Sequence, residues 1–299
     1  MLRATGRAFA RAALAGNPSD GFGGATLAVP IRELAAEVEL GAEGDVHPEA
    51  RRLVEAARRR LARELVLPPA GIARVATTIP REVGLGGSSA IVTAALRALL
   101  EIAGADLPPL ELAKVALQAE THELGIAAGP QDRIVQAFET LVAMDFAHAE
   151  PRCEPLDPSL LPPLFLAWRT DSAEHSGAVH GDLRARWDAG HAPTRACMDR
   201  LADHARDAHA ALLANDHARF AAALDASFDV RRDLVPDLDP RHVRMVEVAR
   251  GAGACANYAG SGGAIVGTAP DLHAVRQALE RDACEVLLPG YPRSDGPRR

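Results

Sequence analysis

Hydrophobic positions along the chain recur with two periods, one of about two residues and one typical of helices. The clearest helical run covers residues 47–65, where Leu53, Val54, Ala57 and Leu61 share one face and arginines occupy the other. The same spacing predicts helices over residues 88–103, 108–123, 181–189, 193–214, 217–228, 242–251 and 272–281, and residues 129–138 are expected to start as a loop and turn into a helix. Short apolar or alternating runs predict strands over residues 7–15, 26–34, 71–79, 141–146, 164–170, 255–258, 264–268 and 284–288.

Strands and helices are mixed along the whole chain, which favours an α+β fold. The stretch 149–163 is rich in proline and polar residues, so it is the best candidate for a domain boundary. We therefore expect an N-terminal domain over residues 1–150, a C-terminal domain over residues 160–290, and a disordered tail over residues 291–299.

Composition narrows the class of protein. With 299 residues, 48% hydrophobic and 24% charged, the chain can build a sizeable core. The net charge of −7 argues against a nucleic-acid partner. No apolar run reaches the roughly 18 residues of a membrane span, and the four cysteines lack metal-ligand spacing. We expect a cytoplasmic protein with reduced thiols, a small-molecule substrate and no membrane partner, as a monomer or homodimer.

Lys114 is the only lysine in the sequence. Any fixed cation at an anion-binding site is therefore expected to be an arginine, whose planar fork can bind phosphate or carboxylate through two hydrogen bonds.

The strongest local motif is a glycine-rich turn that opens directly onto a predicted helix. Glycine lets the backbone approach an anion closely, and the free N–H groups of a first helical turn attract negative charge. Ser88 and Ser89 are expected to cap the helix and to reach phosphate oxygens or a magnesium ion. The alternative is an ordinary glycine loop with a serine cap, and no Walker A sequence is present. The motif comprises Pro80, Gly84, Leu85, Gly86, Gly87, Ser88, Ser89 and Ala90.

Two carboxylates follow this motif. Glu120 lies near the end of a predicted helix and can supply a metal ligand, whereas Asp132 follows a glycine-introduced turn and can act as a general base. Phosphoryl transfer needs both a divalent ion on the phosphates and a group that orients the attacking hydroxyl. The alternative for this pair is a solvated helix face followed by a helix cap.

Two further segments carry candidate chemistry. Residues 258–264 include Gly260, Ser261, Gly262 and Gly263, which form either a tight turn between strands or a second phosphate-binding loop. Near the N-terminus, the turn at residues 16–20 offers polar groups for sugar hydroxyls, and Arg11 precedes it, either to steady Asp132 or as an exposed strand arginine. The candidate substrate ligands of this turn are Asn17, Ser19 and Asp20.

These pieces, in this order, resemble the GHMP kinase family. Pro80, Gly84, Leu85 and the Ser88-Ser89-Ala90 triplet match its second motif, and residues 260–263 match its third. The resemblance implies two domains with the active site in the cleft between them, ATP and Mg²⁺ as cofactors, and Arg11 and Asp132 as catalytic residues. It also implies a metal site at Glu120 with Ser88 or Ser89.

Within that family, the amino-acid sequences of several segments are similar to those of the plant-type glucuronokinase subfamily. The subfamily shares the Asn17-Pro18 turn and the longer Gly86-Gly87 loop, both of which depart from the wider family. The resemblance implies phosphorylation of the anomeric hydroxyl of D-glucuronate, and Arg231 or Arg232 are candidates for its carboxylate. The alternatives are a GHMP kinase for a neutral sugar or a mevalonate-like acid, and a non-catalytic ligand-binding protein of the same fold. The segments are residues 16–20, 79–81, 84–92, 123–126, 131–133 and 228–232.

Overall fold

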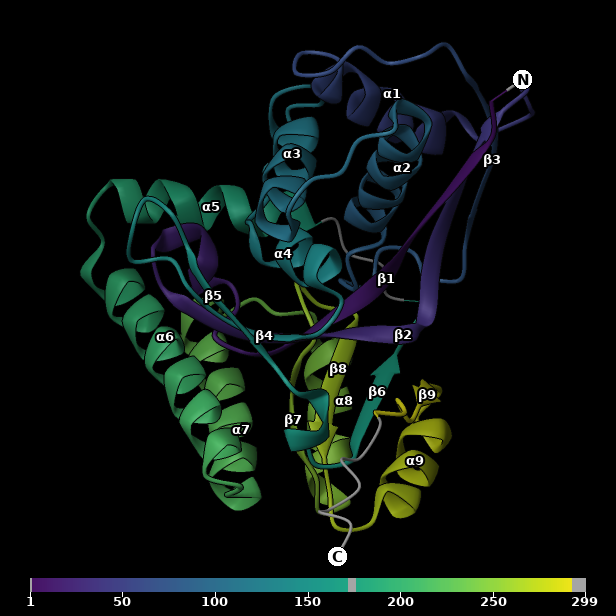
Figure 1. The fold of residues 1–299 in the computed structure, drawn as a ribbon. Helices are drawn as coiled ribbons and strands as arrows, with labels where there is room; N and C mark the ends of the chain where they lie inside the picture. Colours follow the sequence, from purple (N-terminus) through teal and green to yellow (C-terminus); the bar gives the residue numbers. More distant parts are fainter. Residues whose placement is uncertain (1, 172–175, 292–299) are drawn as a thin grey trace, which may run out of the picture. The chain divides into compact units, whose positions relative to one another are not determined.

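The computed structural model describes residues 2–171 and 176–291, with side chains left out for 176–181. By contact, these residues form two compact units, and each is described here by itself. The first unit holds residues 2–11, 30–80 and 85–139; the second holds 12–29, 81–84 and the described residues from 140 onward. The units are therefore interleaved along the chain, whereas the predicted domains are consecutive. Figure 1 labels their helices and strands.

The first unit is built mainly of helices. These are α1 (Pro48–Leu61), α2 (Gly87–Ala103), α3 (Pro109–Thr121) and α4 (Gln131–Phe138). Helix α2 packs against the other three (Figure 1), which explains why it is apolar almost all round. Strand β1 (Ala4–Ala15) approaches α2 so closely that a Cβ on Gly6 would lie 1.8 Å from the carbonyl oxygen of Ala94.

A two-strand pairing completes the first unit. Strand β3 (Gly71–Thr77) pairs antiparallel with the second half of β2 (Ala25–Gly41), in the register Ala36 to Thr77 and Gly41 to Gly71. Strand β2 thus continues well beyond residue 34, where the sequence pattern places its end.

The second unit contains the first part of β2, which pairs with β4 (Leu141–Asp145), and β4 pairs in turn with β5 (Arg152–Leu156). A separate antiparallel sheet has the strand order β7-β8-β6-β9. Its members are β6 (Leu164–Trp168), β7 (Cys255–Tyr258), β8 (Ala264–Thr268) and β9 (Glu285–Leu287).

Five helices of the second unit are described. They are α5 (Ser176–Asp188), α6 (Ala192–Leu213), α7 (His217–Leu234), α8 (Pro240–Gly251) and α9 (Leu272–Arg281). Helices α6 and α7 pack side by side (Figure 1), and α7 also contacts β7. The core between helices and sheet is centred on the fully buried side chains of Phe165, Phe228 and Tyr258. Short 3-10 turns cover Ser19–Phe22 and Pro158–Leu160.

Most predicted elements are present, and two differ in an informative way. The proline-rich stretch 149–163 contains strand β5, so it is not a structureless linker. Helix α7 continues to Leu234 rather than ending at Phe228, and it therefore contains Arg231 and Arg232. The predicted tail, apart from Tyr291, lies outside the described residues. Among the helices described, none combines the length and apolar character that crossing a membrane requires.

Candidate functional site

The first cluster of predicted residues centres on an ion pair within the first unit. Arg11, on β1, donates from Nε to Oδ1 of Asp132 at 2.6 Å and from Nη2 to Oδ2 at 2.7 Å. Asp132 lies in the first turn of α4. The Arg11 side chain is 5% exposed and that of Asp132 18%. A two-pronged guanidinium contact of this kind favours the ionised carboxylate and fixes its orientation.

The backbone of Arg11 joins this ion pair to the glycine loop, because its N–H donates to the carbonyl of Leu85 at 3.1 Å. Gly86 is the N-cap of α2 and adopts a left-handed conformation with φ 73°. Its carbonyl accepts hydrogen bonds from the Ala90 N–H at 3.0 Å, Ser89 Oγ at 3.0 Å and Gln136 Nε2 at 2.9 Å. The prediction that serine side chains cap this helix is wrong, since Ser89 donates to a carbonyl instead.

Helix α2 thus begins at a glycine held from three directions. The first N–H groups of a helix have no partner within the helix, and they carry its positive dipole end. The loop leading into α2 therefore has the electrostatic character of an anion site. Gln136, fully buried on α4, is a supporting residue that sequence reasoning missed.

Glu120 lies on α3 and is fully buried. Its Oε2 accepts from Nε of Arg133 at 2.7 Å and from Nη2 of the same guanidinium, while Oε1 accepts from Ser88 Oγ at 3.2 Å. Ser88 is exposed, whereas Ser89 is buried. Of the two predicted serines, the structure therefore places Ser88 beside Glu120.

These residues fit a magnesium ion. Mg²⁺ prefers oxygen ligands and is commonly held by one or two carboxylates together with substrate phosphates and water. The Ser88 hydroxyl and Oε1 of Glu120 are two such oxygens side by side. Within the described residues, no group of three or more His, Cys, Asp or Glu side chains forms an all-protein metal cage.

The second cluster lies within the second unit and centres on Arg231. This residue is 3% exposed, and it donates from Nη1 to Asn17 Oδ1 at 2.9 Å and from Nη2 to the carbonyl of Ser261 at 3.1 Å. Its guanidinium also lies over the ring of Tyr258, 5.3 Å from the centroid. The structure thereby joins the turn at residues 16–20 to the glycine motif at 260–263. Arg232 is exposed.

The two glycine motifs also meet within the second unit. A Cβ on Gly84 would lie 2.8 Å from the carbonyl oxygen of Gly262 and 2.9 Å from the Ser261 nitrogen. A Cβ on Gly263 would lie 2.8 Å from Cα of Val83. Both glycines have positive φ, 74° and 81°. Close backbone approach and backbone conformation together explain why glycine occupies these positions.

The remaining predicted substrate ligands differ in accessibility. Ser19 is fully buried, and its hydroxyl donates to the carbonyl of Ala25 at 2.9 Å, which stabilises the turn itself. Asp20 is 9% exposed and Asn17 is half-buried. The peptide bond between Asn17 and Pro18 is cis.

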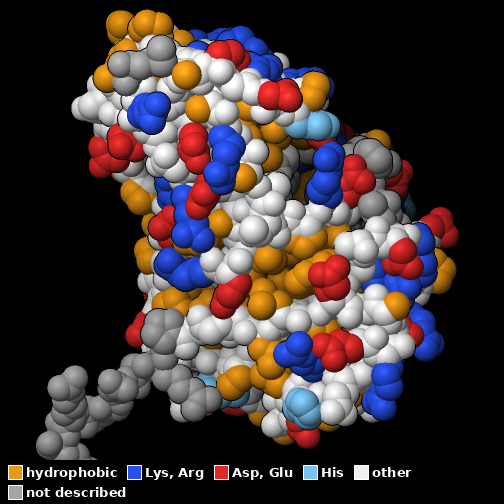
Figure 2. Space-filling view, turned by 90° about the vertical axis from the view of Figure 1, so that its right-hand side faces the viewer, with side chains coloured by type: hydrophobic (Ala, Val, Ile, Leu, Met, Phe, Trp, Pro, Cys, Tyr) orange, Lys and Arg blue, Asp and Glu red, His pale blue; other side chains and the backbone are white. Residues whose placement is uncertain are grey.

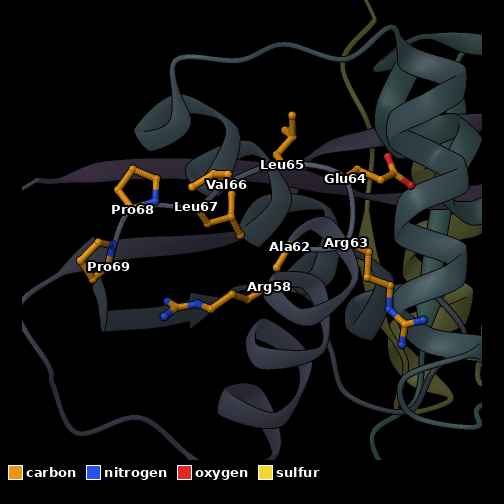
Figure 3. Close-up of a pocket in the computed structure, with 9 residues that line it drawn as sticks. All are labelled: Arg58, Ala62, Arg63, Glu64, Leu65, Val66, Leu67, Pro68 and Pro69. Atoms are coloured by element: carbon orange, nitrogen blue, oxygen red, sulfur yellow. The ribbon is translucent and has the colours of Figure 1, made fainter.

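Two pockets lie apart from these residues. Figure 3 shows one of about 470 Å³ at the end of α1, lined by Arg58 and residues 62–69, with Arg58 and Arg63 extending in opposite directions. The other, of about 270 Å³, lies between α6 and strands β2, β4 and β5. Cys153 lines it, and burial raises the pKa of this thiol to about 11, so it is protonated at neutral pH.

The surface charges are mixed in sign. On the face drawn in Figure 2, basic and acidic side chains are interspersed around an apolar area. Many are paired, as Arg206 is with Asp145 at 3.3 Å. Lys114 is 61% exposed on α3, and the basic side chains of both clusters are arginines.

Comparison with known proteins adds an independent view. Residues 51–140 match the family model described as the GHMP kinases N terminal domain. The chain is 38% identical over 215 residues to Glucuronokinase 1 of Arabidopsis thaliana, an alignment that covers 69% of this chain and 59% of that protein. The chain therefore matches less than two thirds of the length of that relative.

Solved structures show the same fold. Streptococcus pneumoniae phosphomevalonate kinase in complex with phosphomevalonate and AMPPNP superposes with a TM-score of 0.81 at 16% identity, covering 98% of this chain and 100% of that one. Lactococcus lactis galactokinase complexed with galactose gives 0.80 at 15% identity, covering 97% and 93%. The α+β class predicted from the sequence is confirmed, whereas the location of the active site in a cleft stays a prediction.

Proposed function

We propose that this chain, whose residues 51–140 match the GHMP kinases N terminal domain, is a kinase of that superfamily and transfers the γ-phosphoryl group of ATP to the anomeric hydroxyl of a uronic acid, with D-glucuronate as the first candidate. The observation that carries the proposal is the contact between Arg11 and Asp132 beside the start of α2. Through this contact, Arg11 links two groups: the Asp132 carboxylate, which can bind the acceptor hydroxyl, and the glycine loop, which can bind phosphate.

The ATP phosphates are assigned to residues 84–89, where the N–H groups at the start of α2 complement their charge. The contact between Gly84 and Gly262 supports a role for the second glycine motif in the same task, since neither of these two residues has a side chain that would obstruct an anion. Pro80 and Ala90 flank this loop in the sequence.

Magnesium is assigned to Ser88 Oγ and Oε1 of Glu120, which lie 3.2 Å apart. Bound there, the ion would neutralise charge on the phosphates during transfer. Ser88 is preferred to Ser89, whose hydroxyl is already donated to the carbonyl of Gly86.

Asp132 is assigned to the acceptor hydroxyl. As the bond from the acceptor oxygen to phosphorus forms and the bond to ADP breaks, the hydroxyl proton passes to the carboxylate. A carboxylate that accepts two hydrogen bonds from Arg11 is a weak base, so its main contribution is to orient the hydroxyl. An anomeric hydroxyl, more acidic than an ordinary alcohol, suits such a base. Arg11 offsets the charge that develops nearby.

The uronate carboxylate is assigned to Arg231, with Asn17 and Asp20 as candidates for the sugar hydroxyls. Arg231 is buried and already bonded to Asn17, so its guanidinium is held in a fixed orientation.

Arg232 is exposed one residue further along α7 and serves as the matched control in a test of this assignment. If the assignment is right, Arg231→Lys raises KM for glucuronate more than KM for ATP, whereas Arg232→Lys changes neither.

The experiment that tests the function measures ADP release with ATP and Mg²⁺ against D-glucuronate, D-galacturonate, glucose, galactose and mevalonate. Release with glucuronate and none of the others supports the proposal in full. Release with a different acceptor retains the kinase and rejects the uronate. If ATP binds but no acceptor triggers release, a ligand-binding role without catalysis gains support.

A matched variant tests the role of the carboxylate. Asp132→Asn should bind ADP as the unchanged protein does and lose about 10²-fold or more in turnover, because the amide can neither accept the proton of the acceptor hydroxyl nor orient that hydroxyl as the carboxylate does. Turnover at the level of the unchanged protein would remove Asp132 from this role.

A further inference from the structure

Arg133 is adjacent in sequence to Asp132 but makes a different set of contacts. Its Nε and Nη2 both donate to Oε2 of Glu120, and its Nη1 donates to the carbonyl of Gly129 at 2.9 Å. The same Nη1 lies 3.8 Å from Oδ2 of Asp132. The Arg133 side chain is 6% exposed and that of Glu120 is fully buried. The pair thus links α3 to α4, away from water, and the Nη1 contact ties α4 to the segment that precedes it.

We propose that Arg133 is a positioning residue for the magnesium ligand Glu120, an inference that rests on the metal assignment in the proposed function. Residues that hydrogen-bond to a metal ligand commonly fix its orientation. By donating twice to Oε2, Arg133 fixes the orientation of the Glu120 carboxylate and directs the other oxygen, Oε1, toward Ser88.

The two oxygens of Glu120 therefore have separate tasks. Oε2 is occupied by the guanidinium, and Oε1 is the one beside the Ser88 hydroxyl. This arrangement commits Glu120 to binding the metal through a single oxygen. Partners of this type, which orient a metal ligand, typically contribute 10- to 100-fold in metal affinity.

A competing electrostatic effect makes the direction of the result decisive. A positive charge beside a ligand also repels a cation, so if Arg133 acted only through its charge, its removal would strengthen metal binding. If it positions Glu120, its removal weakens metal binding. If it merely supports the fold, binding of nucleotide with and without metal changes equally.

The test measures ADP binding by calorimetry in Mg²⁺ and in EDTA, and it takes the ratio of the two affinities as the metal coupling. We expect Arg133→Met to reduce this ratio by about 10- to 100-fold and to leave ADP affinity in EDTA unchanged. Arg133→Lys keeps the charge but loses the planar fork, so its affinity ratio should fall between those of the unchanged protein and Arg133→Met. If Arg133→Met does not fold, a reduced ratio in Arg133→Lys supports the positioning role and an unchanged ratio contradicts it.

Two further variants sharpen the outcome. Arg60→Met is the matched control, since it removes a guanidinium of the same unit that is 13% exposed and bonded to Gln118 and Glu64, and it should leave the ratio unchanged. In a Glu120→Gln background, Arg133→Met should have no additional effect, because Arg133 acts through Glu120.

The outcomes separate this inference from the proposed function. A ratio of one in the unchanged protein, or no effect of Glu120→Gln, would overturn the metal assignment itself. If Glu120→Gln lowers the ratio but the Arg133 variants leave it unchanged or raise it, only the positioning role of Arg133 is overturned.

Discussion

The guanidinium of Arg11 and the carboxylate of Asp132 meet in parallel, Nε to Oδ1 at 2.6 Å and Nη2 to Oδ2 at 2.7 Å. The partners are 121 residues apart in sequence, one on the first strand and one at the start of α4. Because a lysine presents a single nitrogen, it cannot reproduce this parallel contact.

Arg11→Lys should therefore lower kcat by about 10²-fold, the magnitude typical of losing one oriented electrostatic contact in an active site. KM for ATP should change far less, since the phosphate loop is not altered. Steady-state kinetics measure both constants. Arg7→Lys is the matched control, because Arg7 lies on the same strand with a side chain 53% exposed. Equal losses in the two variants would contradict a specific role for Arg11.

The close approach of Gly84 to Gly262 gives a second prediction. Both Gly84→Ala and Gly104→Ala place a side chain on a left-handed residue, at φ 74° and 62°, which costs about 1–2 kcal/mol. Only at Gly84 does the new Cβ meet backbone atoms, since nothing lies within 4 Å of it at Gly104. Denaturant unfolding should show a larger loss for Gly84→Ala, together with weaker ADP binding. Equal losses, with ADP binding unchanged, would mean that the loop shifts to make room.

Replacing each of the two serines of the glycine motif should have a different effect, on the Mg²⁺ requirement for Ser88 and on stability for Ser89. Ser88→Ala removes the hydroxyl beside Glu120 and should raise the Mg²⁺ concentration needed for half-maximal turnover. Ser89→Ala removes a buried hydrogen bond to Gly86 and should cost about 1 kcal/mol of unfolding free energy, without a change in the Mg²⁺ requirement. Magnesium titrations and thermal unfolding of both variants make the comparison. The reverse pattern would assign the metal to Ser89.

Asp239 gives a prediction about pH. The hydrogen bond from Arg241 lowers the pKa of this carboxyl to about 2 in the folded protein, below its value in an unfolded chain. The folded state therefore binds this proton less readily, so the contribution to stability is present above about pH 4 and is lost as the pH falls toward 2. Asp239→Asn and Arg241→Met should each flatten the fall in unfolding free energy over this range. A fall as steep as that of the unchanged protein would contradict the assignment.

The sequence alone indicated the motifs well, because glycine loops and nearby carboxylates are local patterns. It assigned no role to Arg133 or Gln136, since their partners, Glu120 and the carbonyl of Gly86, are brought to them only by the packing of α2, α3 and α4. The expected serine cap failed for a related reason. The left-handed conformation of Gly86 lets its own carbonyl attract the Ser89 hydroxyl.

The structure differs from the predicted elements in two places, and both differences have physical causes. The proline-rich stretch 149–163 contains β5, which lies at the edge of its sheet, where a residue without an N–H is tolerated, and Pro155 pairs there with Val142. The predicted helix ends at Phe228, whereas α7 continues to Leu234 and includes the buried Arg231. A buried arginine interrupts an apolar pattern without interrupting the helix.

The distribution of basic side chains has a practical consequence. Apart from an α-amino group, Lys114 is the only primary amine that the sequence provides, and it projects from α3 with 61% of its side chain exposed. Amine-directed reagents should therefore attach a single reporter group to this helix and spare the guanidinium groups of Arg11, Arg133 and Arg231. Since α3 also carries Glu120, a fluorophore at Lys114 is attached to the same helix as the proposed magnesium ligand.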